Sequence, residues 1–90
     1  MTRDEIRTAA LELLAEIAPE LDPPALRGDV ALRDQVDLDS MDFLNYLISI
    51  HQRLAVEIPE GDYDRLATLD GLVAYVDEAL RETPPPAATA

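Results

Sequence analysis

Apolar residues recur at helical spacing along the first part of the chain, from Thr2 to Ile17. The positions that would share one helix face are Ile6, Ala9, Ala10, Leu13, Leu14 and Ile17. Thr2 and Glu5 form a capping-box pattern at the start of this stretch. Pro19 follows its end, and the residue before a proline is pushed out of the α region. The pattern therefore predicts a first helix over residues 2–17.

A second helical pattern begins at Ser40 and continues to about Leu54. A narrow polar stripe is formed by Asp42, Asn45, Ser49 and Gln52, and an inward seam by Phe43, Leu47, Ile50 and Leu54. One-sided packing needs only about three apolar positions per two turns, and this helix has more. The extra apolar residues either pack against the preceding loop or form a partner-facing stripe. They are Met41, Leu44, Tyr46 and Ile48.

Two further helices are predicted after residue 55. Residues 60–66 follow Pro59 and favour a short third helix. Thr68 is a residue type that caps helices, and it predicts the start of the last helix. The inward face of that helix is assigned to Leu69, Leu72, Val73, Val76, Ala79 and Leu80.

The segment between the first two helices, residues 18–39, is rich in helix breakers and has irregularly spaced aliphatic residues. It is predicted to be a long loop, and such loops are uncommon in compact domains unless they are functional, which directs attention to Ser40 at its end. The predicted fold class is all-α: a four-helix bundle with three longer helices, a short third helix and a long loop between helices one and two. One domain is assigned to residues 1–82, and the Pro/Ala-rich tail, residues 83–90, is predicted to be disordered.

Composition narrows the possible functions. The 90 residues include 19 acidic and 7 basic ones, all arginine, for a formal net charge of −12. Such a charge repels nucleic acid and anionic membranes, and it favours protein partners with basic patches. The chain has no cysteine, which excludes a disulfide framework, a thiolate nucleophile and a zinc–thiolate site. It shows neither a signal peptide nor a membrane-spanning stretch, so a cytoplasmic protein is predicted. A stand-alone monomer is expected, because the chain begins and ends close to the predicted bundle.

Ser40 stands among aspartates, and its surroundings allow three interpretations. The first is a helix cap, because serine and aspartate are both favoured where a helix begins. The second is a calcium loop that begins at Asp37, whose fifth, sixth and twelfth positions would need an oxygen ligand, a glycine and a glutamate. The chain has Met41, Asp42 and Ile48 there, which excludes an EF-hand and leaves only loose binding of a divalent ion open.

The third interpretation is a catalytic nucleophile, which requires a base within hydrogen-bond reach. The only histidine, His51, lies eleven residues further along the same predicted helix, about 16 Å away, and cannot serve Ser40. The sequence also lacks a glycine-rich phosphate loop and a histidine cluster. The chain is therefore not predicted to be an enzyme.

The stretch LRDQVDLDSMDFLNYLISI resembles the phosphopantetheine attachment region of acyl carrier proteins, in which an Asp-Ser-aliphatic triplet opens the second helix. The stretch VEIPEGDYDRLATLDGLVAYV is similar to a later region of the same family, with Ile-Pro-acidic before the short third helix. The likeness covers residues 2–81. It implies that Ser40 receives phosphopantetheine from coenzyme A by the action of a separate, magnesium-dependent phosphopantetheinyl transferase. The arm would then present acyl groups, as thioesters, to acyl-transferring or acyl-activating enzymes.

The resemblance also implies roles for the neighbours of Ser40. Asp39 would help to position the transferase and its magnesium, and Met41 would lie beside the attached arm. Met41 also borders the partner-docking surface. That surface is assigned to Asp42, Leu44, Asn45 and Ile48.

Two features depart from the family pattern. Asp37 stands where the family commonly has glycine, and Asp42 is the remaining acidic residue on the outward face of the second helix. These departures favour a specialised carrier with a dedicated partner over the general carrier of fatty-acid synthesis. An aminoacyl or peptidyl carrier remains an alternative, as does an acidic helical adaptor in which Ser40 is only a cap.

Overall fold

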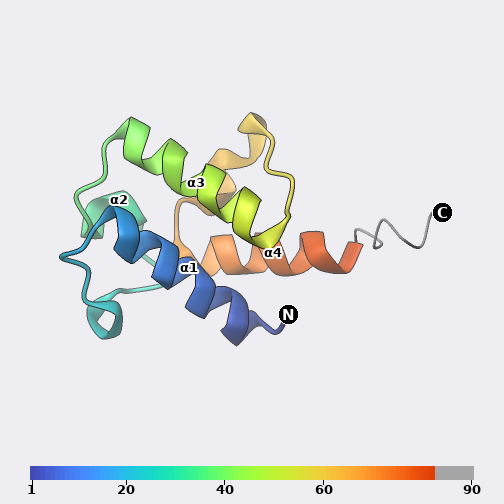
Figure 1. Cartoon of the computed structure of the whole chain (residues 1–90), viewed down its shortest axis with the longest axis horizontal. Helices are drawn as coiled ribbons and strands as arrows, with labels where there is room; N and C mark the ends of the chain where they lie inside the picture. The colour runs from blue at the N-terminus through green and yellow to red at the C-terminus, as the bar shows by residue number, and fades with distance from the viewer. Residues whose placement is uncertain (83–90) are drawn as a thin grey trace.

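The computed structural model describes residues 1–82, which form a bundle of helices (Figure 1). The α-helices are α1 (Arg3–Ile17), α2 (Leu32–Gln35), α3 (Ser40–Leu54) and α4 (Leu69–Glu82). Two 3₁₀ helices, η1 (Pro23–Ala25) and η2 (Glu60–Leu66), lie in the connections. α1 packs against both α3 and α4, and η2 packs against α4. The all-α prediction is confirmed, whereas the tail predicted to be disordered, residues 83–90, lies outside the described residues.

Capping side chains define the starts of α1 and α4. Thr2 and Glu5 form the predicted capping box: the Glu5 amide donates to Thr2 Oγ1 at 3.2 Å, and the Thr2 amide donates to Glu5 Oε1 at 2.8 Å. The hydrogen bond from the Thr2 backbone lowers the pKa of Glu5. At the start of α4, Thr68 Oγ1 accepts from the Gly71 amide at 3.0 Å, as predicted. Local signals of this kind explain why the predicted helix starts agree with the observed ones.

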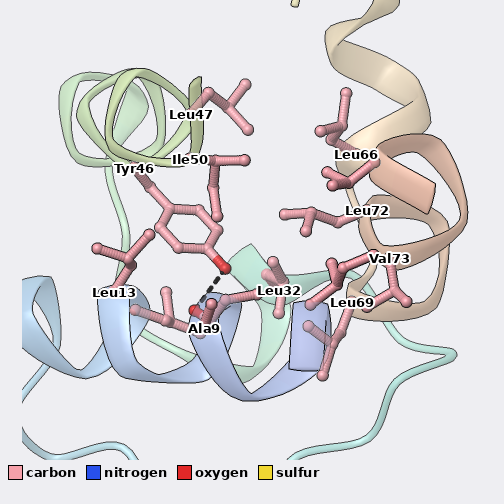
Figure 2. Close-up of a cluster of buried hydrophobic side chains, with 14 of the residues drawn as sticks. Ala9, Leu13, Leu32, Tyr46, Leu47, Ile50, Leu66, Leu69, Leu72 and Val73 are labelled. Carbon is pink, nitrogen blue, oxygen red and sulfur yellow. Dashed lines mark hydrogen bonds between the residues drawn. The ribbon is translucent and has the colours of Figure 1, made fainter. Parts of the chain in front are cut away.

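Tyr46 lies at the centre of a largely aliphatic core (Figure 2). Its side chain is fully buried and points toward α1, where Ala9 lies near its hydroxyl end. A tyrosine is buried at low cost only when its hydroxyl finds an acceptor, and here it donates to the Ala10 carbonyl at 2.9 Å. Burial raises the pKa of Tyr46. Tyr46 therefore belongs to the inward seam, to which the apolar pattern does not assign it, while Phe43 is only half-buried.

The connection between α1 and α3 is more regular than the predicted loop. It contains η1 and α2, and the buried side chain of Leu32 anchors α2. The Leu32 amide donates to the Ala67 carbonyl at 2.8 Å, and the Asp70 amide donates to the Gly28 carbonyl at 3.0 Å, so the connection is tied to the start of α4. The loop prediction is wrong at residues 32–35, because one helical turn is too short to show an apolar period.

Gln35 holds the same connection together from within. Its side-chain nitrogen donates to the Arg27 carbonyl at 2.7 Å and to the Val30 carbonyl at 2.9 Å. Its side-chain oxygen accepts from the Arg27 amide at 2.7 Å. These bonds satisfy backbone groups that a loop would otherwise leave without partners. The segment that leads into α3 is thereby held in place.

Asp77 is a buried carboxylate that links the start of α1 to the end of α4. It accepts from Arg3 Nε at 2.9 Å and from Arg81 Nε at 3.0 Å, and its side chain is only 5% exposed. The hydrogen bonds from Arg3 and Arg81 hold the pKa of Asp77 below its ordinary value. The ionised form of Asp77 therefore stabilises the link between α1 and α4.

We expect the Asp77→Asn variant to be less stable than the parent protein at neutral pH. A carboxyl group whose pKa is lowered by folding stabilises the fold above its unfolded-state pKa, and this contribution is lost as the pH falls through the lower folded-state value. The stability difference between parent and variant should therefore shrink below about pH 4, the ordinary range of aspartate. Urea unfolding at a series of pH values measures this stability difference. Asp64→Asn is the control, because the Asp64 side chain is exposed. A difference that is independent of pH would contradict this role.

Candidate functional site

Ser40 is the first residue of α3 and is exposed, at the end of that helix that lies beside α2 (Figure 1). The cap is Asp39, whose Oδ1 accepts from the Asp42 amide at 2.8 Å, while Asp42 Oδ2 accepts from the Asp39 amide at 3.4 Å. Carboxylates at this position are stabilised by the positive end of the helix dipole. The interpretation of Ser40 as the helix cap is therefore wrong, and its hydroxyl takes no part in capping α3.

Among residues 1–82, the side chain within hydrogen-bond distance of the Ser40 hydroxyl is that of an arginine. Arg33 Nη2 lies 3.5 Å from Ser40 Oγ, at the outer limit of a hydrogen bond. His51 is near the other end of α3, where its Nδ1 forms a hydrogen bond of 2.7 Å with the Val56 carbonyl. In residues 1–82 no histidine or carboxylate forms a hydrogen bond with Ser40 Oγ. The only hydrogen-bond partner of Ser40 Oγ among the described residues is therefore an arginine.

The aspartates around Ser40 are not arranged as a metal site. They are Asp34, Asp37, Asp39 and Asp42. Two of them, Asp39 and Asp42, use their carboxylates in the capping box. Across the described residues, no group of three or more histidine, cysteine, aspartate or glutamate side chains could hold a metal ion. The loose divalent-ion binding left open by the sequence therefore has no built site there.

The residues predicted to form the docking surface gather on one outward face of α3. They are Asp42, Leu44, Asn45 and Ile48, and Met41 borders them one turn before Leu44 and Asn45. Met41 and Ile48 are large apolar side chains, yet they are 62% and 41% exposed. The face therefore has an exposed apolar centre, next to Ser40.

A pocket of about 180 Å³ opens between α3 and η2. It is lined by Leu47, Ile48, His51, Glu57, Ile58 and Tyr63. Ile48 also belongs to the outward face of α3, so the pocket adjoins that face. Sequence patterns do not reveal this pocket, because its walls come from segments that only the tertiary fold brings together.

The class of protein follows from comparison with known families. A model of the family described as "Phosphopantetheine attachment site" matches residues 8–76. The chain therefore belongs to the acyl carrier protein family, whose members hold phosphopantetheine as a covalent prosthetic group and act as carriers rather than enzymes.

Individual relatives agree with this assignment. The acyl carrier protein of Streptomyces coelicolor is 31% identical over 77 residues, which cover 86% of this chain and 79% of that protein. The meromycolate extension acyl carrier protein of Mycobacterium tuberculosis is 28% identical over 84 residues, 93% of this chain and 72% of that protein. The solution structure of a protein from Anaplasma phagocytophilum, assigned as an acyl carrier protein, has a TM-score of 0.75 at 26% identity and covers 94% of this chain and 97% of that one.

The residues around Ser40 fit a phosphopantetheine group. The hydroxyl is exposed, is not used in capping, and lies within the matched residues. Arg33 places a positive charge beside the oxygen that would bear the phosphodiester. The positive end of the α3 dipole would also attract the phosphodiester, whereas the carboxylates of Asp39 and Asp42 would repel it.

None of the helices in the described part of the chain is long and apolar enough to cross a membrane.

Proposed function

We propose that phosphopantetheine is attached to Ser40 Oγ and that the protein carries acyl groups as thioesters on the thiol of that arm. The observation that carries this proposal is that Ser40 is exposed and that Asp39, not Ser40, caps α3, so the Ser40 hydroxyl is free to react. The chain has no cysteine, so the arm supplies the thiol that thioester chemistry needs. The protein's own contribution is to hold one serine oxygen at the surface, beside a face that a partner enzyme recognises.

A separate phosphopantetheinyl transferase performs the attachment. The Ser40 oxygen forms a phosphodiester with the phosphopantetheine part of coenzyme A, the nucleotide part leaves, and a base of the transferase accepts the hydroxyl proton. The cap uses Oδ1 of Asp39, which leaves Oδ2 available to the transferase and its magnesium. Met41, at the next position along α3 and 62% exposed, flanks the attached arm.

Partner enzymes dock on the outward face of α3. Its members are Asp42, Leu44, Asn45 and Ile48, with Met41 at the border. The exposed apolar residues supply an interface centre, and the net charge of −12 favours acyl-transferring or acyl-activating enzymes with surrounding basic patches. The mostly uncharged face itself supports a dedicated partner. Because its apolar centre is small, the protein is assigned as a monomer, and it is placed in the cytoplasm, where coenzyme A is available.

The pocket between α3 and η2 is a place for part of the acyl chain. Its apolar lining comes from Leu47, Ile58 and Tyr63. The pocket also contacts Ile48, which is on α3, the helix that begins with Ser40. Ligand pockets are typically about 300–1,000 Å³, so this one of about 180 Å³, with His51 and Glu57 at its polar edge, holds only a short part of a chain.

Loading followed by acylation tests this function. Co-expression with a broad-specificity phosphopantetheinyl transferase should raise the intact mass by one phosphopantetheine. A carrier-acylating enzyme and its acyl donor should then add one acyl group that hydroxylamine removes, because hydroxylamine cleaves thioesters. An acidic adaptor would gain neither mass, and an aminoacyl or peptidyl carrier would gain the arm but accept an aminoacyl group instead.

A further inference from the structure

Arg33 is held beside the Ser40 hydroxyl by contacts of its own. Its Nε donates to the Leu38 carbonyl at 3.3 Å, and its guanidinium carbon lies 6.0 Å from the centre of the Phe43 ring, within the range of a cation–π contact. Its Nη2 is the atom that faces Ser40 Oγ, at 3.5 Å. α2, which carries Arg33, is in turn anchored by the buried Leu32. The guanidinium is therefore positioned by residues on both sides of Ser40.

Arg33 also differs from every other arginine of the chain. All seven arginines lie within the described residues, and six form ion pairs with carboxylates at 2.9 to 3.8 Å. These six are Arg3, Arg7, Arg27, Arg53, Arg65 and Arg81. Among residues 1–82, Arg33 is the arginine without such a partner, although the chain has 19 acidic residues. The nearby carboxylates of Asp39 and Asp42 are directed to backbone amides instead.

The geometry points to Arg33 as the ligand of the phosphodiester on Ser40, an inference that rests on Ser40 being the attachment site. A neutral hydroxyl at 3.5 Å is a weak acceptor, whereas a phosphodiester adds charged oxygens beyond Oγ on the exposed side of the residue. Arginine is suited to this contact because its planar fork donates two parallel hydrogen bonds to phosphate. Arg33 is then a positioning residue: it restrains the root of the arm and offsets the repulsion from Asp39 and Asp42.

Phosphorus and arginine NMR on the loaded protein test this inference. In the parent protein, loading should shift the Arg33 Nε–Hε resonance. The ³¹P resonance of the loaded Arg33→Gln variant should differ from that of the loaded parent. Raising the salt concentration should move the parent ³¹P resonance toward that of the variant, because salt screens an exposed ion pair. The ³¹P resonance of the loaded Arg33→Lys variant should lie between those of the parent and Arg33→Gln, because lysine keeps the charge but lacks the planar guanidinium fork.

Arg27→Gln is the matched control, because Arg27 is an exposed arginine that pairs with Asp29 at 2.9 Å. It should leave the ³¹P resonance unchanged. Intact mass separates the two proposals, since it reports loading independently of Arg33. A loaded protein whose ³¹P resonance is the same in parent and Arg33→Gln, with an unshifted Arg33 side chain, would overturn the role of Arg33 alone. A protein that gains no arm would overturn this role together with the proposed function.

Discussion

Replacing Ser40 with alanine should leave a folded protein that gains no phosphopantetheine. The fold should survive because Asp39, and not Ser40, caps α3, and because alanine is a good helix former at this exposed position. We expect the free energy of unfolding to change by no more than about 0.5 kcal/mol. The loss of loading should be complete, because the substitution removes the oxygen that forms the phosphodiester. Intact mass after incubation with transferase and coenzyme A measures loading, and urea unfolding measures stability.

Two variants separate attachment from capping. Ser49 is the only other serine of the chain, and its hydroxyl donates to the Asn45 carbonyl at 3.0 Å in the middle of α3. Ser49→Ala should therefore load as fully as the parent. Asp39→Ala should instead cost about 0.5–2 kcal/mol of stability, because it removes the cap. A Ser40→Ala protein that still gains an arm, or that unfolds while Asp39→Ala stays stable, would contradict these assignments.

Replacing Tyr46 with alanine should remove much of the stability of the fold. Loss of a buried aromatic ring costs about 3–5 kcal/mol, and domains of this kind are stable by only about 5–15 kcal/mol. Tyr46 is fully buried, and its hydroxyl is bonded to the Ala10 carbonyl, so both ring and hydroxyl contribute. Urea unfolding followed by circular dichroism measures the loss.

Tyr46→Phe isolates the hydroxyl and should cost about 1 kcal/mol, since it removes one hydrogen bond and keeps the ring. Ile48→Ala is the matched control on the outward face of α3, where the side chain is 41% exposed and little stability should be lost. If Tyr46→Ala were no more damaging than Ile48→Ala, the assignment of Tyr46 to the core would be wrong.

The sequence predicts the helices well where their ends have local chemical signals. The Thr2 and Glu5 capping box, Pro19, Pro59 and Thr68 each act within a few residues, and the observed helices begin and end beside them. The Asp39–Ser40 pair is a signal of the same kind, because both residue types are favoured where a helix begins, and α3 begins at Ser40. Which of Asp39 and Ser40 is the cap depends on a shift of one residue, and both residue types are favoured there, so composition does not decide it.

The features that the sequence misses depend on tertiary contacts. Tyr46 is buried where α3 packs against α1, which supplies the Ala10 carbonyl as the acceptor for its hydroxyl, and this is not visible in the pattern of α3 alone. A Cβ at Gly71 would lie 2.5 Å from the Arg65 carbonyl oxygen, so this glycine allows η2 to end against α4.

Arg33 belongs to α2 and lies seven residues before Ser40, so the periodicity of a single helix does not relate the two residues. The one sequence signal for it is the presence of an arginine in the connection, between the prolines and Ser40.

The most direct measurement of the central claim is the location of the arm within the loaded protein. Cleavage after arginine releases residues 34–53, a peptide that contains both serines of the chain. Fragmentation of that peptide in a mass spectrometer should place the added mass on Ser40 and leave the fragments that contain only Ser49 unchanged. Added mass on Ser49, on any other residue, or on none would contradict the account.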